Sequence, residues 1–261
     1  MNKVIIPVDF SETALNAARF TARMLAGKKD TLVILYHHYD NEDDFDVVKN
    51  FMESLKKDLL LRGDTAVEYE MEMGGNLINN LELLAQSRKA TLIAMGITGK
   101  SAFEQAVVGS KTLELADRKI CPVMIIPPKA VFSAIKNVAF ASDFNNVEDS
   151  TPAAQINAVL DMFNPNLHIV NVIPENNVSV TDEHKQGKDE FTAIFQNHSP
   201  EFYFIVMNDF HQALDNFVKD HNIDLLLTIP RHHSNESGLL RSTNTKKLAY
   251  HSSIPILATH K

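Results

Sequence analysis

The chain has 261 residues, which is enough for two domains of ordinary size. Apolar residues make up 44% and charged residues 22% of it, the balance of a soluble globular protein. The net charge of -8 argues against nucleic acid or an anionic membrane as the main partner, because both require a basic face.

The first half of the chain alternates apolar runs with helical patterns. Short apolar runs predict strands, and apolar residues spaced by three and four predict helices. The residues that alternate with glutamates over 67–73 predict a half-exposed edge strand. The other expected strands cover 4–8, 32–36, 92–95 and 123–126, and the helices cover 12–26 with Ser11 as N-cap, 45–59, 77–84 and 110–118.

The second half repeats this plan. The segment "KVIIPVDF" at 3–10 recurs as "NVAFASDF" at 137–144, with Asp9 and Asp143 134 positions apart. "ICPVMII" at 120–126 recurs as "SIPILAT" at 253–259, with Pro122 and Pro255 133 positions apart. Matching offsets at both ends of a unit indicate one domain repeated in tandem. The expected strands cover 138–141, 167–172, 202–206, 225–229 and 255–257, and the helices cover 150–163 with Pro152 in the first turn, 182–197, 209–221 and 243–251.

Strands that are separated by helices form a parallel sheet with right-handed crossovers. The sequence therefore predicts an α/β protein with two tandem, open, five-stranded parallel-sheet sandwiches of the Rossmann-like type. We expect domains over 1–128 and 133–261, because "PPKAVFSA" at 127–134 has the composition of a short stiff linker.

The segment "MGITGKSAFEQAVVGS" at 95–110 carries the strongest functional signal. Its Gly-Lys-Ser at 99–101 is not a P-loop, because Ala94 stands where the first glycine is required and the loop follows the fourth strand. A different spacing fits: Gly96 and Gly99 are followed, after nine residues, by Gly109 and Ser110. Glycines there permit positive φ and close approach of backbone N–H groups to an anion, and Ser110 opens a helix whose N-terminus favours phosphate.

This G-x2-G-x9-G-[ST] pattern resembles the nucleotide signature of ATP-binding universal stress proteins. The strand that ends in "VDFS" and the closing "CPVMIIP" agree with that family, and the resemblance covers nearly the whole chain. The resemblance implies an adenine nucleotide alpha hydrolase-like fold in which the first strand lies beside the fourth. It also implies that ATP or AMP binds at the ends of these two strands, and that Asp9 could hold an accompanying Mg²⁺. The implied nucleotide-binding residues are Pro7, Val8, Asp9, His38, Met95, Gly96, Gly99, Lys100, Gly109, Ser110 and Lys111.

Several of these residues have a simpler interpretation. Asp9 alone could cap a helix, and Gly96 with Gly99 could form a plain turn. Lys100 and Ser101 could be solvated loop residues. His38, expected just after the second strand, is placed near the adenine contact only by the resemblance.

The second copy departs from the motif. Without a gap, Gly96 aligns with Ile229, Gly99 with His232, Gly109 with Ser242 and Ser110 with Thr243. Side chains at these positions would obstruct phosphate, so we expect no equivalent ATP binding there. The aligned loop is basic, with Arg231, His232, His233 and Arg241. It could bind another anion, although a solvated loop is the simpler interpretation.

Metal and thiol chemistry have weak support. The pairs His37–His38 and His232–His233 lack the helical spacing or neighbouring cysteines of a zinc site. The single cysteine, Cys121, cannot form an intramolecular disulfide and lies in "KICPVMII", which predicts a buried thiol. With no signal-peptide pattern and no apolar stretch of about 18 residues, we expect a cytoplasmic protein without a membrane span.

We therefore expect a stress-response protein that binds an adenine nucleotide and is regulatory rather than catalytic, with no catalytic residues. One alternative is a slow ATPase or a nucleotidyl-transfer enzyme of the same broad fold, although "VDFSET" lacks the glycines of a pyrophosphate loop. Another is a nucleotide-independent interaction scaffold. By the resemblance the two domains pair as an intramolecular pseudo-dimer, and a further homodimer stays open.

Overall fold

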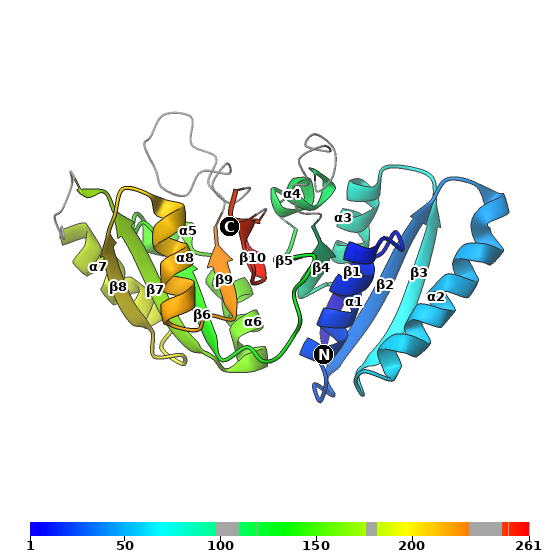
Figure 1. Cartoon of the computed structure of the whole chain (residues 1–261), viewed down its shortest axis with the longest axis horizontal. Coiled ribbons are helices and arrows are strands. Elements are labelled where there is room, and N and C mark those ends of the chain that lie inside the picture. Colours follow the sequence, from blue (N-terminus) through cyan, green and yellow to red (C-terminus); the bar gives the residue numbers. More distant parts are fainter. Residues whose placement is uncertain (98–109, 119, 176–181, 230–246, 250, 261) are drawn as a thin grey trace. The chain divides into compact units, whose positions relative to one another are not determined.

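The computed structural model describes residues 1–97, 110–118, 120–175, 182–229, 247–249 and 251–260. The chain divides into two compact units, Met1–Ser133 and Ala134–Lys261. Figure 1 shows that each unit is a parallel sheet flanked by helices. Over the described ranges, none of the helices has both the length and the apolar character needed to cross a membrane.

The first unit has the strand order β3-β2-β1-β4-β5, and all of its pairings are parallel. β1 lies beside β4, and β3 forms the edge, as expected. Its strands are β1 (Asn2–Pro7), β2 (Thr31–Tyr39), β3 (Ala66–Met73), β4 (Leu92–Gly96) and β5 (Val123–Ile126). Its helices are α1 (Glu12–Met24), the 3-10 turn η1 (Glu42–Asp44), α2 (Phe45–Leu60), α3 (Leu77–Arg88) and α4 (Ser110–Ala116).

The second unit repeats this order as β8-β7-β6-β9-β10. Its parallel pairings are those expected of a duplicated α/β fold. Its strands are β6 (Asn137–Ala141), β7 (Asn166–Ile173), β8 (Glu201–Val206), β9 (Leu225–Thr228) and β10 (Ile256–Ala258). Its helices are α5 (Val147–Ser150), α6 (Ala153–Phe163), α7 (Asp182–Ile194) and α8 (Phe210–Asp220).

The central strands are buried on both faces, which is why they read as continuous apolar runs. Val4, Ile5 and Ile6 of β1 are fully buried, as are Leu92 and Ile93 of β4. Two of the helices of the first unit, α1 and α3, start at side-chain caps. Ser11 Oγ accepts from the Ala14 amide at 3.3 Å in α1. This cap was predicted from the sequence, and it orients α1 at the end of β1.

Several boundaries differ from the sequence-based expectation; α3, for example, continues beyond Leu84 to Arg88. β2 continues three residues beyond Tyr36, to Tyr39. Pro152 is the N-cap of α6 and does not lie in its first turn. The short helix α5 occupies the loop after β6, where no helix was expected. Most of the helix expected over 243–251 lies outside the described residues.

Candidate functional site

The carboxyl ends of β1 and β4 meet at one edge of the first sheet. Ile5 pairs with Ile93, so two residues further along Pro7 is level with Met95. Pro7 and Met95 are both buried, whereas Asp9 is exposed just beyond β1. In open parallel sheets ligands bind at such an edge, where neighbouring strands lead into helices in opposite directions. The predicted residues Pro7, Val8, Asp9, Met95 and Gly96 therefore converge on one edge.

The turn after β1 is built around the Asp9 carboxylate. Its Oδ1 accepts hydrogen bonds from the Ser11 amide at 3.0 Å and the Ser11 hydroxyl at 2.6 Å. Between them, Phe10 has a φ of 60°, which is unfavourable for a bulky side chain. Among the described residues, Asp9 Oδ2 accepts no hydrogen bond. Oδ1 of Asp9 thus shapes the turn, and Oδ2 takes no part in it.

Gly96, at the end of β4, is packed between the first turns of two helices. A Cβ at this position would lie 2.4 Å from the Thr13 carbonyl oxygen of α1. On the other side, the buried Thr112 hydroxyl of α4 donates to the Gly96 carbonyl at 3.0 Å. The φ of Gly96 is not positive. The expected role of this glycine is therefore corrected: its small size allows close packing on α1, and it does not serve a left-handed turn.

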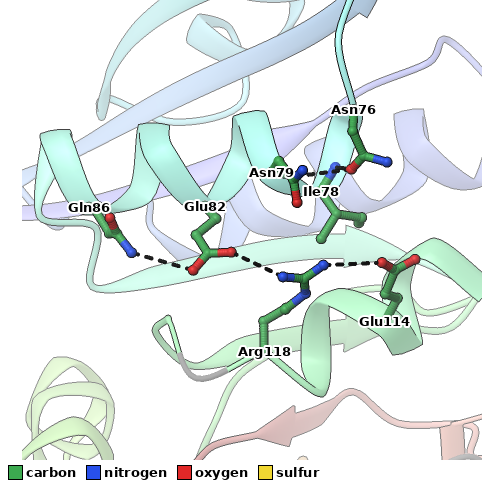
Figure 2. A network of polar contacts seen from close by, with 7 residues as sticks. All are labelled: Asn76, Ile78, Asn79, Glu82, Gln86, Glu114 and Arg118. Carbon is green, nitrogen blue, oxygen red and sulfur yellow. Dashed lines mark hydrogen bonds and ion pairs between the residues drawn. The ribbon is translucent and has the colours of Figure 1, made fainter.

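The far end of α4 is joined to α3 by Arg118, as Figure 2 shows. Its Nη1 donates to Glu82 Oε2 of α3 at 3.4 Å, and its Nη2 lies 3.5 Å from Glu114 Oε1 of α4. Gln86 approaches the same Glu82 carboxylate at 3.5 Å. α3 itself begins at the N-cap Asn76. These contacts orient α4, the helix that starts with Ser110.

The end of β2 carries two adjacent histidines with different roles. His37 Nδ1 lies 2.6 Å from the carbonyl oxygen of Val8. His38 Nε2 lies 2.9 Å from the carbonyl oxygen of Gly74, which also accepts from Asn80 at 3.0 Å. A carbonyl can only accept, so each of these ring nitrogens carries a proton. His38 was expected after the strand, but it lies inside β2, whose extension to Tyr39 keeps it paired with β3.

The backbone of His38 faces the side of β2 on which β1 lies. Successive residues of a strand direct their backbone groups to alternate sides. The Tyr36 carbonyl accepts from the Val8 amide at 2.8 Å, on the β1 side, and the Tyr39 carbonyl accepts from the Gly74 amide at 2.9 Å, on the β3 side. His38 therefore presents an N–H and a C=O beyond the last β1–β2 pairing, Pro7 with Tyr36.

A polar pair, Tyr36 and Glu72, lies near the ends of β2 and β3. The buried Tyr36 hydroxyl donates to Glu72 Oε2 of β3 at 2.9 Å. Burial, together with this hydrogen bond, raises the pKa of Tyr36 well above its usual range. Tyr36 is therefore a neutral donor at physiological pH, and it fixes the ends of β2 and β3 relative to each other.

The phosphate side of the motif is only partly described. Gly99, Lys100 and Gly109 lie outside the described residues. Ser110 is the first residue of α4, and Lys111 is exposed in the first turn. Nowhere in the described ranges do three or more His, Cys, Asp or Glu side chains form a group that could hold a metal ion. Of the described residues at this edge, Asp9 is the predicted residue that could hold a cation.

The corresponding edge of the second unit is built differently. Asn171, at the position of His37, donates to the Ser142 carbonyl at 2.8 Å, and Phe144 repeats the φ of 60° seen at Phe10. The buried Ile229 stands at the position of Gly96. The helix α5 begins at Val147, shortly after Phe144. Gly187 of α7 packs closely on this turn, since a Cβ at Gly187 would lie 2.9 Å from the Phe144 carbonyl oxygen. The turn is thus retained, but the glycine that ends β4 is replaced by a side chain.

Sequence reasoning missed three residues that shape this site: Thr13, Thr112 and His37. Thr112 lies two residues after the motif serine, on the apolar face of a short helix. His37 was weighed only as part of a metal-binding pair. The repeat offset could have indicated His37, because it aligns with Asn171, another hydrogen-bonding side chain near the end of the second strand of its unit.

Two parallel sheets of identical strand order, each with its first strand beside its fourth, define a tandem Rossmann-like α/β protein. Residues 1–127 match the model of the Universal stress protein family. Residues 1–127, which make up nearly all of the first unit, therefore form a universal stress protein domain. A universal stress protein of Methanocaldococcus jannaschii is 28% identical over 138 residues, which cover 48% of this chain and 81% of that protein.

Solved structures resemble the chain over its full length. A universal stress protein from Archaeoglobus fulgidus DSM 4304 is 16% identical with a TM-score of 0.70, and the match covers 99% of this chain and 98% of that one. A functionally unknown protein from Pseudomonas aeruginosa PAO1 is 13% identical with a TM-score of 0.61, covering 99% and 92%. These matches show that the tandem fold is shared by other proteins.

Proposed function

We propose that the protein is a cytoplasmic, regulatory stress-response protein that binds one ATP or AMP at the carboxyl edge of its first sheet. The observation that carries the proposal is the convergence of Asp9, Gly96 and the start of α4 at the ends of β1 and β4. The family match over residues 1–127 and the G-x2-G-x9-G-S spacing support the same site.

The phosphate groups would lie at the segment between Gly96 and Ser110. The Thr112–Gly96 hydrogen bond fixes the start of α4 against the end of β4. Unpaired amides of a first helical turn, together with glycine amides before it, favour a negative charge. Lys111, exposed in that turn, would be stabilised by a neighbouring phosphate.

The adenosine group would lie on the β1–β2 side of the same edge. His38 offers a backbone donor and acceptor there, a pair that matches the amino and ring nitrogens of adenine. The exposed Asp9 keeps one oxygen for a ribose hydroxyl or Mg²⁺, since its other oxygen binds Ser11. The buried Pro7, Val8 and Met95 would form the apolar floor below.

The second unit would not bind ATP in this way. Ile229 places a side chain at the Gly96 position, and α5 occupies the loop after β6. We accordingly propose one nucleotide per chain. The role is proposed as regulatory because Asp9, the one candidate base among the described residues at this site, already accepts hydrogen bonds from Ser11 through one oxygen.

Isothermal titration of ATP and AMP tests the proposal, using the wild type and a Gly109→Val/Ser110→Ala double variant. We expect a stoichiometry of one and a loss of affinity of at least tenfold in the variant. A Ser242→Ala/Thr243→Ala variant at the aligned positions of the second unit is the matched control and should bind like the wild type. Equal affinity in all three proteins would remove the assigned site. Phosphate release above that of the double variant would instead favour a slow ATPase.

A further inference from the structure

The second unit contains a buried histidine that the nucleotide site does not use. His168 lies on β7 opposite Glu201 of β8, and only 7% of its surface is exposed. Among the described residues, neither of its ring nitrogens has a hydrogen-bond partner. A buried polar group without a partner is costly, so a feature of this kind calls for an explanation.

The groups that face His168 come from three neighbouring elements. From β8, Glu201 Oε2 lies 3.6 Å from His168 Nδ1, and the Tyr203 ring centroid lies 5.6 Å from that of His168. From α8 and its C-cap, the ring centroids of Phe217 and His221 lie 6.2 and 6.0 Å away. From β6, the residue paired with His168 is Ala139, which carries no charge. We call these residues the His168 cluster.

We propose that His168 is an acid-sensitive latch: neutral, it holds β8 and α8 against β7, and its protonation releases this edge of the second unit. The proposal is independent of nucleotide binding, and it concerns the second unit alone.

Protonation of His168 would add a positive charge and a second N–H to a site with little compensating negative charge and few hydrogen-bond acceptors. Among the described residues, Glu201 is the only carboxylate that forms an ion pair with His168. Its side chain is 65% exposed, and its Oε2 already accepts from the Tyr203 hydroxyl at 2.6 Å. An ion pair with so exposed a partner recovers little of the cost of desolvating the imidazolium. Burial, partly offset by Glu201, accordingly lowers the pKa of His168.

His221 adds a second unfavourable contribution in acid. Its ring stacks on Phe217 with centroids 3.9 Å apart, and its Nδ1 lies 3.2 Å from the Phe217 carbonyl oxygen. A positive charge on the neighbouring His221 ring would repel one on His168, and this repulsion contributes to the lowered pKa of His168. The cluster therefore becomes less stable on both counts as the pH falls.

The position of the cluster makes release local. β8 is the edge strand of the second sheet, and its described pairing is to β7 alone. Tyr203 and Phe217, packed with centroids 4.9 Å apart, connect the edge strand with α8. Elements at an edge open at lower cost than central strands, so destabilisation here exposes β8 and α8 first.

Hydrogen–deuterium exchange of the full chain at pH 7.5 and pH 5.0, corrected for intrinsic chemical exchange, tests the latch. In the wild type, peptides from β8 and α8 should exchange faster in acid, by up to about tenfold per pH unit below a histidine pKa of about 6.5, while β1 changes little. His168→Ile should abolish this acceleration. Isoleucine is chosen because the equivalent position of the first unit is Ile34, which is fully buried. His251→Asn, at an exposed site, should behave as the wild type.

Equal acceleration in the wild type and His168→Ile, or none in either, would overturn the proposal. Should His168→Ile fail to fold, the ring titration of His168 in the wild type, followed by NMR and assigned with a His168→Gln variant, decides instead. A midpoint below about 6.5 supports the latch, and a midpoint at or above it contradicts the latch.

Discussion

His37 Nδ1 lies 2.6 Å from the carbonyl oxygen of Val8, and this bond ties β2 to the point where the chain leaves β1. Asn171 makes the equivalent bond to Ser142 in the second unit, at 2.8 Å. Different side chains therefore satisfy the same buried carbonyl in the two copies. Two residues after that carbonyl, the backbone φ is 60° in both units, at Phe10 and at Phe144. The bond helps to hold the strained turn that presents Asp9.

Substitution at His37 should show that hydrogen bonding, and not the imidazole itself, is required. His37→Leu leaves the Val8 carbonyl without this buried donor and should lower the free energy of unfolding by about 1–3 kcal/mol. His37→Asn, the residue that the second unit uses, should lose less than half of that. Urea unfolding measures both variants. Equal losses would mean that packing alone matters here.

Gly96→Ala should be strongly disruptive because its Cβ would lie 2.4 Å from the Thr13 carbonyl oxygen. Overpacking of this kind costs about 1–3 kcal/mol or more, and relief by moving α1 would also displace the Asp9 turn. We expect lower stability together with weaker ATP binding. Gly27→Asn is the control, since a side chain at Gly27 meets no atom within 4 Å and asparagine tolerates its φ of 79°. A stable, fully binding Gly96→Ala variant would refute the close packing.

The Arg118 contacts should contribute orientation with little stability. Arg118 and Glu82 are 42% and 31% exposed, and exposed ion pairs contribute about 0–1 kcal/mol. A double-mutant cycle with Arg118→Gln and Glu82→Gln should give a coupling energy below about 1 kcal/mol that decreases in high salt. A coupling several times larger, unaffected by salt, would show that the pair is effectively buried.

Cys121 should be unreactive in the folded protein. Burial raises the pKa of this thiol to about 12, so almost no thiolate forms at pH 8. We expect an aromatic disulfide reagent to modify it only when denaturant unfolds the chain. The unfolded thiol ionises near its ordinary pKa of 9.0, so the free energy of unfolding should fall as the pH rises above about 9. Rapid modification without denaturant would contradict the buried position.

Most elements could be predicted because apolar periodicity is strong in a doubly covered parallel sheet. β5 was placed to the residue, at Val123–Ile126. The extension of β2 was not, because His37, His38 and Tyr39 interrupt the apolar run while their backbone continues the pairing with β3. α5 was also missed, since a helix of four residues is too short to show a period.

The candidate site could be located from the sequence, but its internal contacts could not. The glycine spacing and the position of Asp9 after β1 indicated that Asp9 and Gly96 follow neighbouring strands, and the structure places both at the carboxyl ends of β1 and β4. A side chain at position 96 would clash with the Thr13 carbonyl oxygen because α1 packs closely on β4. No local sequence pattern encodes that distance. The use of one Asp9 oxygen by Ser11 likewise depends on the geometry of the turn.

The most direct test of the nucleotide site compares two equivalent aspartates by isothermal titration with ATP and Mg²⁺. Asp9 and Asp143 each form a turn through Oδ1, with the amides of Ser11 and Asn145, so asparagine at either position keeps the turn. We predict one ATP per chain, an affinity reduced about tenfold or more in Asp9→Asn, and an unchanged affinity in Asp143→Asn. No binding by the wild type, or a loss confined to Asp143→Asn, would contradict a nucleotide site in the first unit.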